Sequence, residues 1–151
     1  MIKGLYEVHL PVSNIRTSVE FYQKLGLQLK EEDDEVAFLW IIPQKSHLGL
    51  WKHEITPERE PGSYPPNGRH LAFEVDFDDI EKAEAWLRER GISVAQHGEK
   101  PPSEPYARPH SRNASVYFND PDGNNLEFIC NLPDGPSEPA RLMYLSEYRS
   151  L

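Results

Sequence analysis

The order of the predicted secondary structure repeats once along this chain of 151 residues, and the repeat restricts the possible folds more than any other feature. A strand at residues 6–12 precedes a helix that ends at Gly26, and the same pair returns at residues 69–75 and in a helix that ends at Gly91. Further strands are predicted at 27–29, 36–42 and 47–51, and again at 92–94, 114–118 and 125–130. Two β-α-β-β-β halves are therefore expected to form one α+β domain.

The two predicted helices have the same design, a polar capping residue followed by an apolar stripe at helical spacing. The expected caps are Ser13 or Asn14 in the first helix, and Asp78 or Asp79 in the second. The stripes are Ile15, Val19 and Tyr22, and then Ile80, Ala83 and Leu87. The aromatic residues Tyr6, Phe21, Trp40 and Trp86 are expected in the core.

Prolines cluster in two segments, residues 56–68 and 100–109. Proline removes a backbone donor and forces the preceding residue out of the helical region, so both segments are predicted to be loops. The first segment divides the chain into its two halves and is interpreted as an internal linker. The acidic run at residues 31–35 is predicted to be a solvated hairpin turn.

Composition excludes several classes of protein. The net charge of −9 argues against nucleic acid as a partner, because a nucleic-acid binder needs a basic face. No apolar run approaches the roughly 18 residues of a membrane span. The single Cys130 excludes a disulfide framework and fits a reducing compartment. We expect a cytoplasmic protein, without a secretion leader, that acts on a small molecule.

Motifs in both halves resemble a known family. They are Leu10–Ile15, Ser18–Tyr22 and Leu25–Leu27 in the first half, and His70–Val75 and Asp120–Glu127 in the second. These motifs are similar to those of the vicinal oxygen chelate superfamily, which includes glyoxalase I, fosfomycin-resistance enzymes, extradiol dioxygenases and bleomycin-resistance proteins. The resemblance covers residues 2–131, with module one at 4–55, module two at 68–131 and a C-terminal extension at 132–151. It implies two βαβββ modules that form a half-barrel around a metal ion, and a homodimer.

The resemblance also implies where a metal would bind. Ligands in this family occupy four equivalent strand positions, which correspond here to Glu7, Gly49, His70 and Glu127. Glycine has no ligating side chain, so Glu7, His70 and Glu127 are the expected ligands, with one face left open for water or substrate. One imidazole and two carboxylates suit a divalent ion such as Zn, Mn, Fe, Co or Ni.

A second histidine lies close to the predicted ligand Glu7. His9 is two residues farther along the same strand and therefore faces the same way. If His9 replaced Glu7 as a ligand, the site would have the two-histidine, one-carboxylate set of non-haem iron oxygenases. Strand register favours Glu7 as the ligand, which leaves His9 as an acid or base beside the metal. Glu7 itself, on leaving the metal, is the alternative group to move a proton.

Other residues are assigned to the pocket or excluded from it. His47 and Trp51 share the inward side of Gly49, and they are expected to line the pocket together with Ser115 and Tyr117. The remaining histidines, His53, His97 and His110, are predicted to have no role in the site.

The resemblance is closer to some activities than to others. Gly49 counts against ordinary glyoxalase I chemistry, because those enzymes carry a carboxylate at this position. Ser111, Ser115 and Tyr117 resemble the phosphonate-contacting segment of fosfomycin-resistance enzymes. However, that family has a threonine where His9 stands, and residues 132–136 lack its basic residue, so the sequence predicts a poor phosphonate binder.

These considerations leave two expectations from different classes. The first is a metal-dependent enzyme of the glyoxalase or dioxygenase type, a lyase or a dioxygenase, whose small oxygen-rich substrate chelates the metal through two oxygens. The alternative is a metal-free protein of the bleomycin-resistance type that binds a small molecule.

Overall fold

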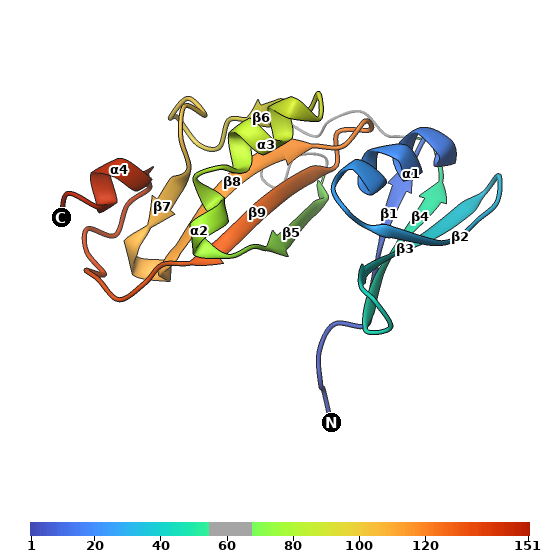
Figure 1. The fold of residues 1–151 in the computed structure, drawn as a ribbon, viewed down its shortest axis with the longest axis horizontal. Coiled ribbons are helices and arrows are strands. Elements are labelled where there is room, and N and C mark those ends of the chain that lie inside the picture. Colours follow the sequence, from blue (N-terminus) through green and yellow to red (C-terminus); the bar gives the residue numbers. More distant parts are fainter. Residues whose placement is uncertain (55–67) are drawn as a thin grey trace. The chain divides into compact units, whose positions relative to one another are not determined.

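The computed structural model describes residues 1–54 and 68–151, and these divide into two compact units (Figure 1). Unit 1 comprises Met1–Arg69 with Asp120–Asn124, and unit 2 comprises His70–Asn119 with Asn125–Leu151. Each unit has its own sheet and helices, so the predicted α+β class is confirmed. The predicted linker at 56–68 lies outside the described residues except for Gly68. The predicted module and domain boundaries remain predictions.

Unit 1 has the predicted β-α-β-β-β order. Its elements are β1 (Glu7–Val12), α1 (Ile15–Lys24), β2 (Gln28–Glu32), β3 (Val36–Ile42) and β4 (Ser46–Lys52). The sheet order is β1-β4-β3-β2, in which β1 runs parallel to β4 and the other pairs are antiparallel. The Asn14 side chain caps α1 by accepting a hydrogen bond from the Thr17 backbone N–H, as expected for a helix N-terminus.

The two faces of the unit 1 sheet differ in chemistry. Leu10, Val12, Leu39, Leu48 and Leu50 are buried, as are Ile15, Val19 and Tyr22 of α1. Successive side chains of a strand point to opposite faces, so the remaining residues form a second face. This second face carries Glu7, His9 and Pro11 of β1, His47, Gly49 and Trp51 of β4, and Phe38 and Trp40 of β3. Polar and aromatic groups are thereby gathered on one side of the sheet.

Unit 2 repeats this order and then extends it. Its elements are β5 (His70–Glu74), α2 (Phe77–Ile80), α3 (Ala83–Glu89), β6 (Val94–Ala95), β7 (Tyr106–Arg108), β8 (Asn113–Asn119), β9 (Asn125–Asn131), β10 (Met143–Tyr144) and α4 (Leu145–Tyr148). The sheet order is β10-β7-β8-β9-β5, and β6 also pairs with β8. β5 runs parallel to β9, as β1 does to β4, while β8 and β9 are antiparallel.

Some predicted details of unit 2 are wrong. The second helix is interrupted after Ile80, and its first part begins after Asp76, so Asp78 and Asp79 lie inside α2 rather than at its cap. The segment 100–109 was predicted to be entirely loop, yet Tyr106–Arg108 forms β7 and pairs with β8. A strand of three residues between two prolines is too short to show an alternating pattern in the sequence. Its pairing with the neighbouring strands outweighs the preference of the flanking prolines for loops.

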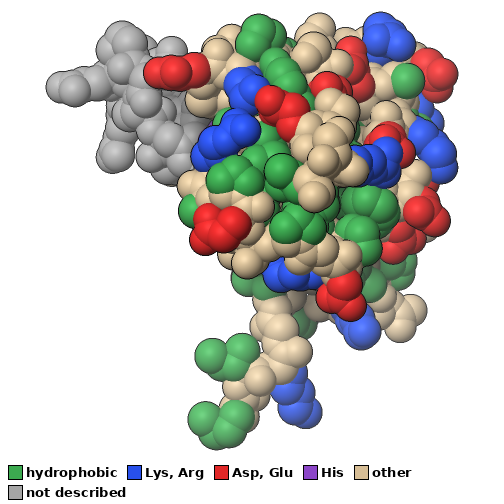
Figure 2. Space-filling view, turned by 90° about the vertical axis from the view of Figure 1, so that its left-hand side faces the viewer, with side chains coloured by type: hydrophobic (Ala, Val, Ile, Leu, Met, Phe, Trp, Pro, Cys, Tyr) green, Lys and Arg blue, Asp and Glu red, His purple; other side chains and the backbone are tan. Residues whose placement is uncertain are grey.

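The N-terminal residues contradict another prediction. Residues 1–6 are exposed and extend away from the sheet as an arm (Figures 1 and 2). Tyr6, predicted to be in the core, is 68% exposed, because it precedes the first paired residue of β1. No helix among residues 1–54 and 68–151 is long and apolar enough to cross a membrane.

A buried carboxylate organises the turn at Asp120–Asn124, which belongs to unit 1. Asp120 Oδ1 accepts the backbone N–H groups of Asp122 and Asn124, both at 2.9 Å. Asp120 Oδ2 accepts the Tyr22 hydroxyl of α1 at 2.9 Å, and the Asn124 amide donates to the Pro11 carbonyl at 3.0 Å. Burial raises the pKa of Asp120. The hydrogen bonds from the Asn124 side-chain amide, from the backbone N–H groups of Asn124 and Asp122, and from the Tyr22 hydroxyl oppose that shift. The turn, α1 and the end of β1 are therefore joined by one hydrogen-bond network.

Removing the Tyr22 hydroxyl should weaken this network without opening a large cavity. Tyr22→Phe should lower the free energy of unfolding by about 1–3 kcal/mol, because a buried carboxylate loses one donor. Urea denaturation followed by circular dichroism measures this loss. Tyr6→Phe, at an exposed tyrosine, is the matched control and should leave the stability unchanged. Equal stability of Tyr22→Phe and wild type would contradict the role given to this hydrogen bond.

Candidate functional site

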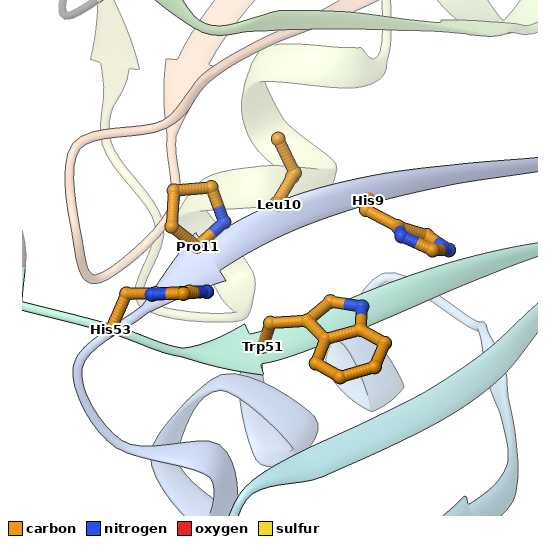
Figure 3. A pocket seen from close by; sticks show the side chains of 5 residues that line it. All are labelled: His9, Leu10, Pro11, Trp51 and His53. Atoms are coloured by element: carbon orange, nitrogen blue, oxygen red, sulfur yellow. The ribbon is translucent and has the colours of Figure 1, made fainter.

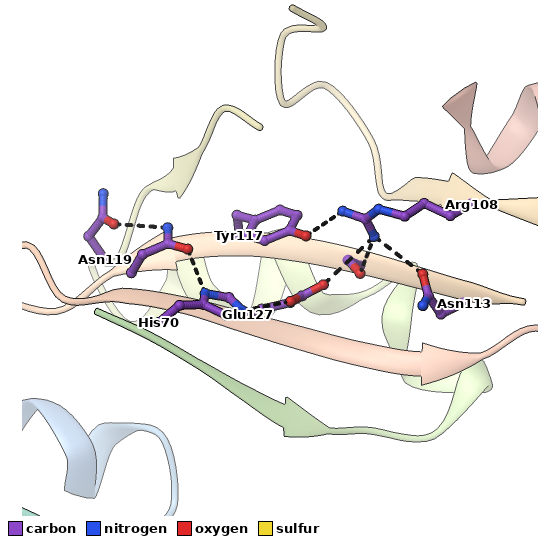
Figure 4. Close-up of polar contacts among 8 residues, drawn as sticks. His70, Arg108, Asn113, Tyr117, Asn119 and Glu127 are labelled. Carbon is purple, nitrogen blue, oxygen red and sulfur yellow. Dashed lines mark hydrogen bonds and ion pairs between the residues drawn. The ribbon is translucent and has the colours of Figure 1, made fainter. Parts of the chain in front are cut away.

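A chain of polar side chains crosses the sheet of unit 2 (Figure 4). The parallel pairing of β5 with β9 sets His70 opposite Asn125, which precedes Glu127 by two residues and points to the same face of the sheet. His70 Nδ1 lies 2.7 Å from Asn125 Oδ1, and His70 Nε2 lies 3.0 Å from Glu127 Oε2. The structure thus brings together His70 and Glu127, two of the three predicted ligands.

The hydrogen bonds assign the proton positions on His70. The amide of Asn125 donates to Asn119 Oδ1 at 3.3 Å, which turns its own oxygen towards His70. His70 Nδ1 therefore carries a proton, and Nε2 is the atom that faces Glu127. In the neutral ring, Nε2 would present a lone pair to a carboxylate oxygen, which is repulsive. The gap between Nε2 and Glu127 Oε2 therefore favours a cation, either a proton on the ring or a metal ion.

The pKa values of this pair reflect the same attraction. The hydrogen bond that the His70 ring donates to Glu127 raises the pKa of His70, although partial burial opposes the shift. Burial would raise the pKa of Glu127, but His70, the hydroxyl groups of Ser115 and Tyr117, and the Arg108 guanidinium together lower it. Each shift favours the charged form of its group in the metal-free protein.

Arg108 of β7 is a site residue that the sequence analysis missed. Its guanidinium donates to Asn113 Oδ1 at 3.2 Å, to Ser115 Oγ at 3.1 Å and to the Tyr117 hydroxyl. Residues 132–136 lack the basic residue of fosfomycin-resistance enzymes, but Arg108 places a basic side chain beside Ser115 and Tyr117. No pattern in the sequence marks this arginine, because its three-residue strand lies between two prolines in a segment that was predicted to be loop.

Arg108 and Glu127 are close and buried but do not form a hydrogen bond. Arg108 Nη1 lies 3.8 Å from Glu127 Oε1, and the two side chains are 17% and 6% exposed. Glu127 Oε1 is buried and accepts no hydrogen bond from residues 1–54 or 68–151. A buried carboxylate oxygen in this state has capacity for a further ligand.

His97 was predicted to have no role, yet it packs against this network. Its ring stacks on Tyr117 with the ring centres 4.2 Å apart and the planes 7° apart. Burial and the nearby positive charge of Arg108 lower the pKa of His97, which favours its neutral form. One face of the Tyr117 ring is thus covered by an imidazole.

Unit 1 gathers the predicted residues Glu7, His9 and His47. Glu7 lies opposite His47 in the parallel ladder, as His70 lies opposite Asn125 in unit 2. Glu7 Oε2 lies 2.8 Å from His47 Nε2, and Glu7 Oε1 lies 3.6 Å from His9 Nε2. The His47 ring meets the rings of Tyr6, Phe38 and Trp40 edge to face, with ring centres 5.3–5.4 Å apart. Trp40, predicted to be core, is half-buried and lies on this face of the sheet.

Gly49 makes room for the His9 ring. A Cβ atom at position 49 would lie 2.7 Å from His9 Cδ2 and 3.0 Å from Phe38 Cε1, both too close for unstrained contact. The imidazole of His9 thus occupies the space above the position at which other members of the resembled family carry a ligand. Any larger residue at position 49 would have to displace that ring.

Unit 1 also contains an open pocket of about 310 Å³, lined by His9, Leu10, Pro11, Trp51 and His53. Figure 3 shows the His9 imidazole near the Trp51 indole, with His53 beside Pro11. Trp51 was predicted to line a pocket, whereas His53 was not. Flat rings beside apolar residues such as Leu10 and Pro11 suit a planar or apolar group.

The predicted site residues fall into two sets. Unit 2 holds His70, Ser115, Tyr117 and Glu127, and unit 1 holds Glu7, His9, His47 and Trp51. Within the described part of the chain, no three His, Cys, Asp or Glu side chains are grouped so as to hold a metal ion. His70 and Glu127 are therefore a pair of potential ligands that needs further donors.

Comparison with known proteins identifies the family. Residues 4–128 match the model of the Glyoxalase/Bleomycin resistance protein/Dioxygenase superfamily. The chain belongs to this superfamily. The family that the sequence motifs suggested is therefore confirmed, while the individual roles of Glu7, His9, His70 and Glu127 remain predictions.

Similar proteins within the superfamily have different activities. Metallothiol transferase FosB of Staphylococcus epidermidis is 30% identical over 134 residues, which cover 84% of this chain and 83% of FosB. Glutathione transferase FosA of Serratia marcescens is 27% identical over 133 residues, covering 84% and 80% of the two chains. The solved structure of Oxidase ChaP-H2 is 25% identical and superposes with a TM-score of 0.64, covering 91% of this chain and all of the other.

The paired state of His70 should be visible as a shifted titration. In the metal-free protein, we expect His70 to titrate above its ordinary pKa of 6.5, and Glu127→Gln should lower that pKa because the attracting charge is lost. Carbon-detected NMR of the histidine rings measures both values. A His70 pKa at or below 6.5 in the wild-type protein would contradict the assignment.

The same pair gives a pH dependence of stability. His70 makes its full contribution to the free energy of unfolding below 6.5, its pKa in the unfolded chain. That contribution is lost as the pH rises through the higher pKa of His70 in the folded protein. The contribution of Glu127 is complete above 4.5 and is lost as the pH falls through its lowered folded pKa. The pair therefore stabilises the metal-free protein most between about pH 4.5 and 6.5.

Proposed function

We propose that this protein is a metal-dependent enzyme that acts on a small, oxygen-rich anionic substrate. His70 and Glu127 would supply two ligands of a divalent ion, and Glu7 of unit 1 is the predicted third. The single observation that carries the proposal is the buried pair of His70 Nε2 and Glu127 Oε2, 3.0 Å apart, whose facing atoms favour a cation between them.

The donor set fits a metal ion in two further respects. His70 uses Nδ1 to donate to Asn125 and keeps Nε2 for the ion, which is the usual arrangement of a metal-bound histidine. Glu127 Oε1 is buried, lies 3.8 Å from Arg108 Nη1 and accepts no hydrogen bond within the described part of the chain, so it can bind an ion as well as the oxygen that faces His70. Imidazole and carboxylate together suit a divalent ion such as Zn, Mn, Fe, Co or Ni.

Arg108 supports an anionic substrate. Its guanidinium is largely buried and is held by the neutral groups of Asn113, Ser115 and Tyr117. The Glu127 carboxylate oxygen is 3.8 Å from the guanidinium, which is beyond hydrogen-bond distance. A planar guanidinium placed in this way can bind a carboxylate, phosphate or phosphonate oxygen through charge-assisted hydrogen bonds.

The chain's own residues then divide the chemical work. A bound divalent ion would act as a Lewis acid on the substrate oxygens. Arg108 would orient the anionic group, and Tyr117 and Ser115 would fix the direction of the guanidinium. His9, which lies over Gly49 and 3.6 Å from Glu7, is the group proposed to move a proton.

The names of the relatives suggest which class of reaction to assay first. FosB and FosA are named as thiol transferases, so transfer of a thiol to the substrate is the first reaction to assay. Lyase and dioxygenase reactions are the next to assay. The second candidate function is metal-free binding of a small molecule, which is favoured by the pocket of flat rings around Trp51.

Metal analysis separates the two candidates. We expect about one divalent ion per chain in protein purified without chelator, and chelation should lower the melting temperature. His70→Ala and Glu127→Ala should each abolish tight binding measured by calorimetry, whereas His110→Ala, at an exposed histidine, should not. Glu7→Gln should weaken binding, because an amide oxygen is a poorer ligand, and His9→Gln should leave it intact. Absence of both bound metal and any thermal shift on adding these ions would refute the enzyme proposal.

Arg108 has a separate test, with methylphosphonate as the probe. Arg108→Gln should weaken methylphosphonate binding by about 10- to 100-fold, because a charge-assisted hydrogen bond is worth about 1.5–3 kcal/mol. Affinity for the metal should not fall, since Arg108 repels a cation. Arg88→Gln, at an exposed arginine of α3, is the control and should bind methylphosphonate as the wild type does. Unchanged binding by Arg108→Gln would remove Arg108 from the site.

A further inference from the structure

The C-terminal residues Leu142–Tyr148, here called the C-terminal brace, lie beyond the region that matches the superfamily. β10 pairs with β7, next to Arg108, and Leu145 N–H donates to the Pro105 carbonyl at 2.9 Å. The brace therefore lies beside the loop at residues 97–105, which leads into β7. In Figure 1 this segment closes the β7 edge of the sheet.

Polar contacts join the brace to this loop along its length. The Glu104 carboxylate accepts the backbone N–H of Ser146 at 3.1 Å and its hydroxyl at 2.9 Å. Lys100 Nζ donates to Glu147 Oε2 at 3.1 Å, and the Tyr144 hydroxyl donates to the Pro101 carbonyl at 3.0 Å. Contacts at three points in a proline-rich loop restrict its motion more than any single contact would.

Ring packing continues the contact into the interior of unit 2. Tyr144 stacks on Tyr106 with the planes 18° apart, and the Lys100 ammonium lies 4.2 Å from the centre of the Tyr144 ring. The Tyr106 hydroxyl donates to the Lys100 carbonyl at 2.8 Å and accepts the His97 backbone N–H at 3.3 Å. The backbone at His97 is thus tied, through Tyr106, to the brace.

At the other end of the loop, His97 covers the Tyr117 ring, and the Tyr117 hydroxyl accepts a hydrogen bond from Arg108. A tyrosine with a second ring stacked on it cannot swing about its Cα–Cβ bond without breaking the stack. The position of the hydroxyl beside Arg108 therefore depends on His97 remaining in place.

We propose that the C-terminal brace holds His97 against Tyr117 and thereby sets the anion affinity of Arg108. The inference rests on the proposed anion-binding role of Arg108 and assigns His97 and Tyr144 as positioning residues for it. Neither residue needs to touch the substrate, because both act through the Tyr117 ring.

The test uses the full-length protein and changes Tyr144. Tyr144→Ala removes the stack on Tyr106, the Lys100 contact and the hydrogen bond to Pro101. We expect the His97 ring signals in NMR to lose the ring-current shift from Tyr117, and the affinity for methylphosphonate to fall about fivefold. Tyr144→Phe keeps the stacking ring and should restore both readouts. Ser150→Ala, two residues beyond the brace, removes a hydrogen bond from the Ser150 hydroxyl to the Ser146 carbonyl and should change neither.

A double-mutant cycle tests whether the effect passes through His97. His97→Ala should lower methylphosphonate affinity by about the same factor, and adding Tyr144→Ala to it should lower the affinity no further. Additive losses would overturn the proposal, as would His97 signals that are unchanged in Tyr144→Ala. If wild-type protein binds no methylphosphonate, the proposed function of Arg108 fails. The His97 signals then decide by themselves whether the brace positions the ring.

Discussion

The side chain of Glu127 is almost completely removed from water, and such a carboxylate remains ionised only if positive charge compensates for the lost hydration. His70 supplies that charge on one side through a 3.0 Å contact, and Arg108 supplies it on the other from 3.8 Å. Three polar residues of the candidate site hold these two partners. Asn125 orients His70, and Ser115 and Tyr117 orient Arg108. The positions of His70 and Arg108 in the candidate site thus meet the need of the buried Glu127 carboxylate for nearby positive charge.

The two units share one strand geometry, but imidazole and carboxylate side chains occupy opposite positions in it. In unit 2 an imidazole faces an amide across the parallel ladder and has a carboxylate as its second neighbour. In unit 1 the equivalent position is the carboxylate of Glu7, and its neighbours His47 and His9 are imidazoles. Because parallel pairing fixes which side chains are opposite one another, such exchanges alter the chemistry of a unit without altering its backbone.

Sequence reasoning succeeded where a periodic pattern extended over several residues. The stripe of α1 and the alternating faces of β1 and β4 follow from spacing alone, and the structure has them as expected. The equivalence of Glu7 and His70 came from the family resemblance, and the two residues occupy corresponding positions in the parallel ladders of the two units. Sequence reasoning failed where three-dimensional pairing decides. Arg108 lies in a strand of three residues between prolines, and His97 reaches Tyr117 only because a loop folds back. Neither position carries a local signal, since the partners are 9 and 20 residues away in the chain.

The Asp120–Asn124 turn determines whether the two halves of the chain can fold separately. These five residues connect β8 to β9, yet they pack with α1 and the end of β1 and satisfy the Tyr22 hydroxyl. If the chain were cut within residues 55–67, the N-terminal fragment would retain a buried tyrosine hydroxyl whose acceptor had left with the other fragment. The two halves look like separate units in sequence, but the second half contributes this turn to unit 1, so the halves should fold as complementary fragments rather than as independent domains.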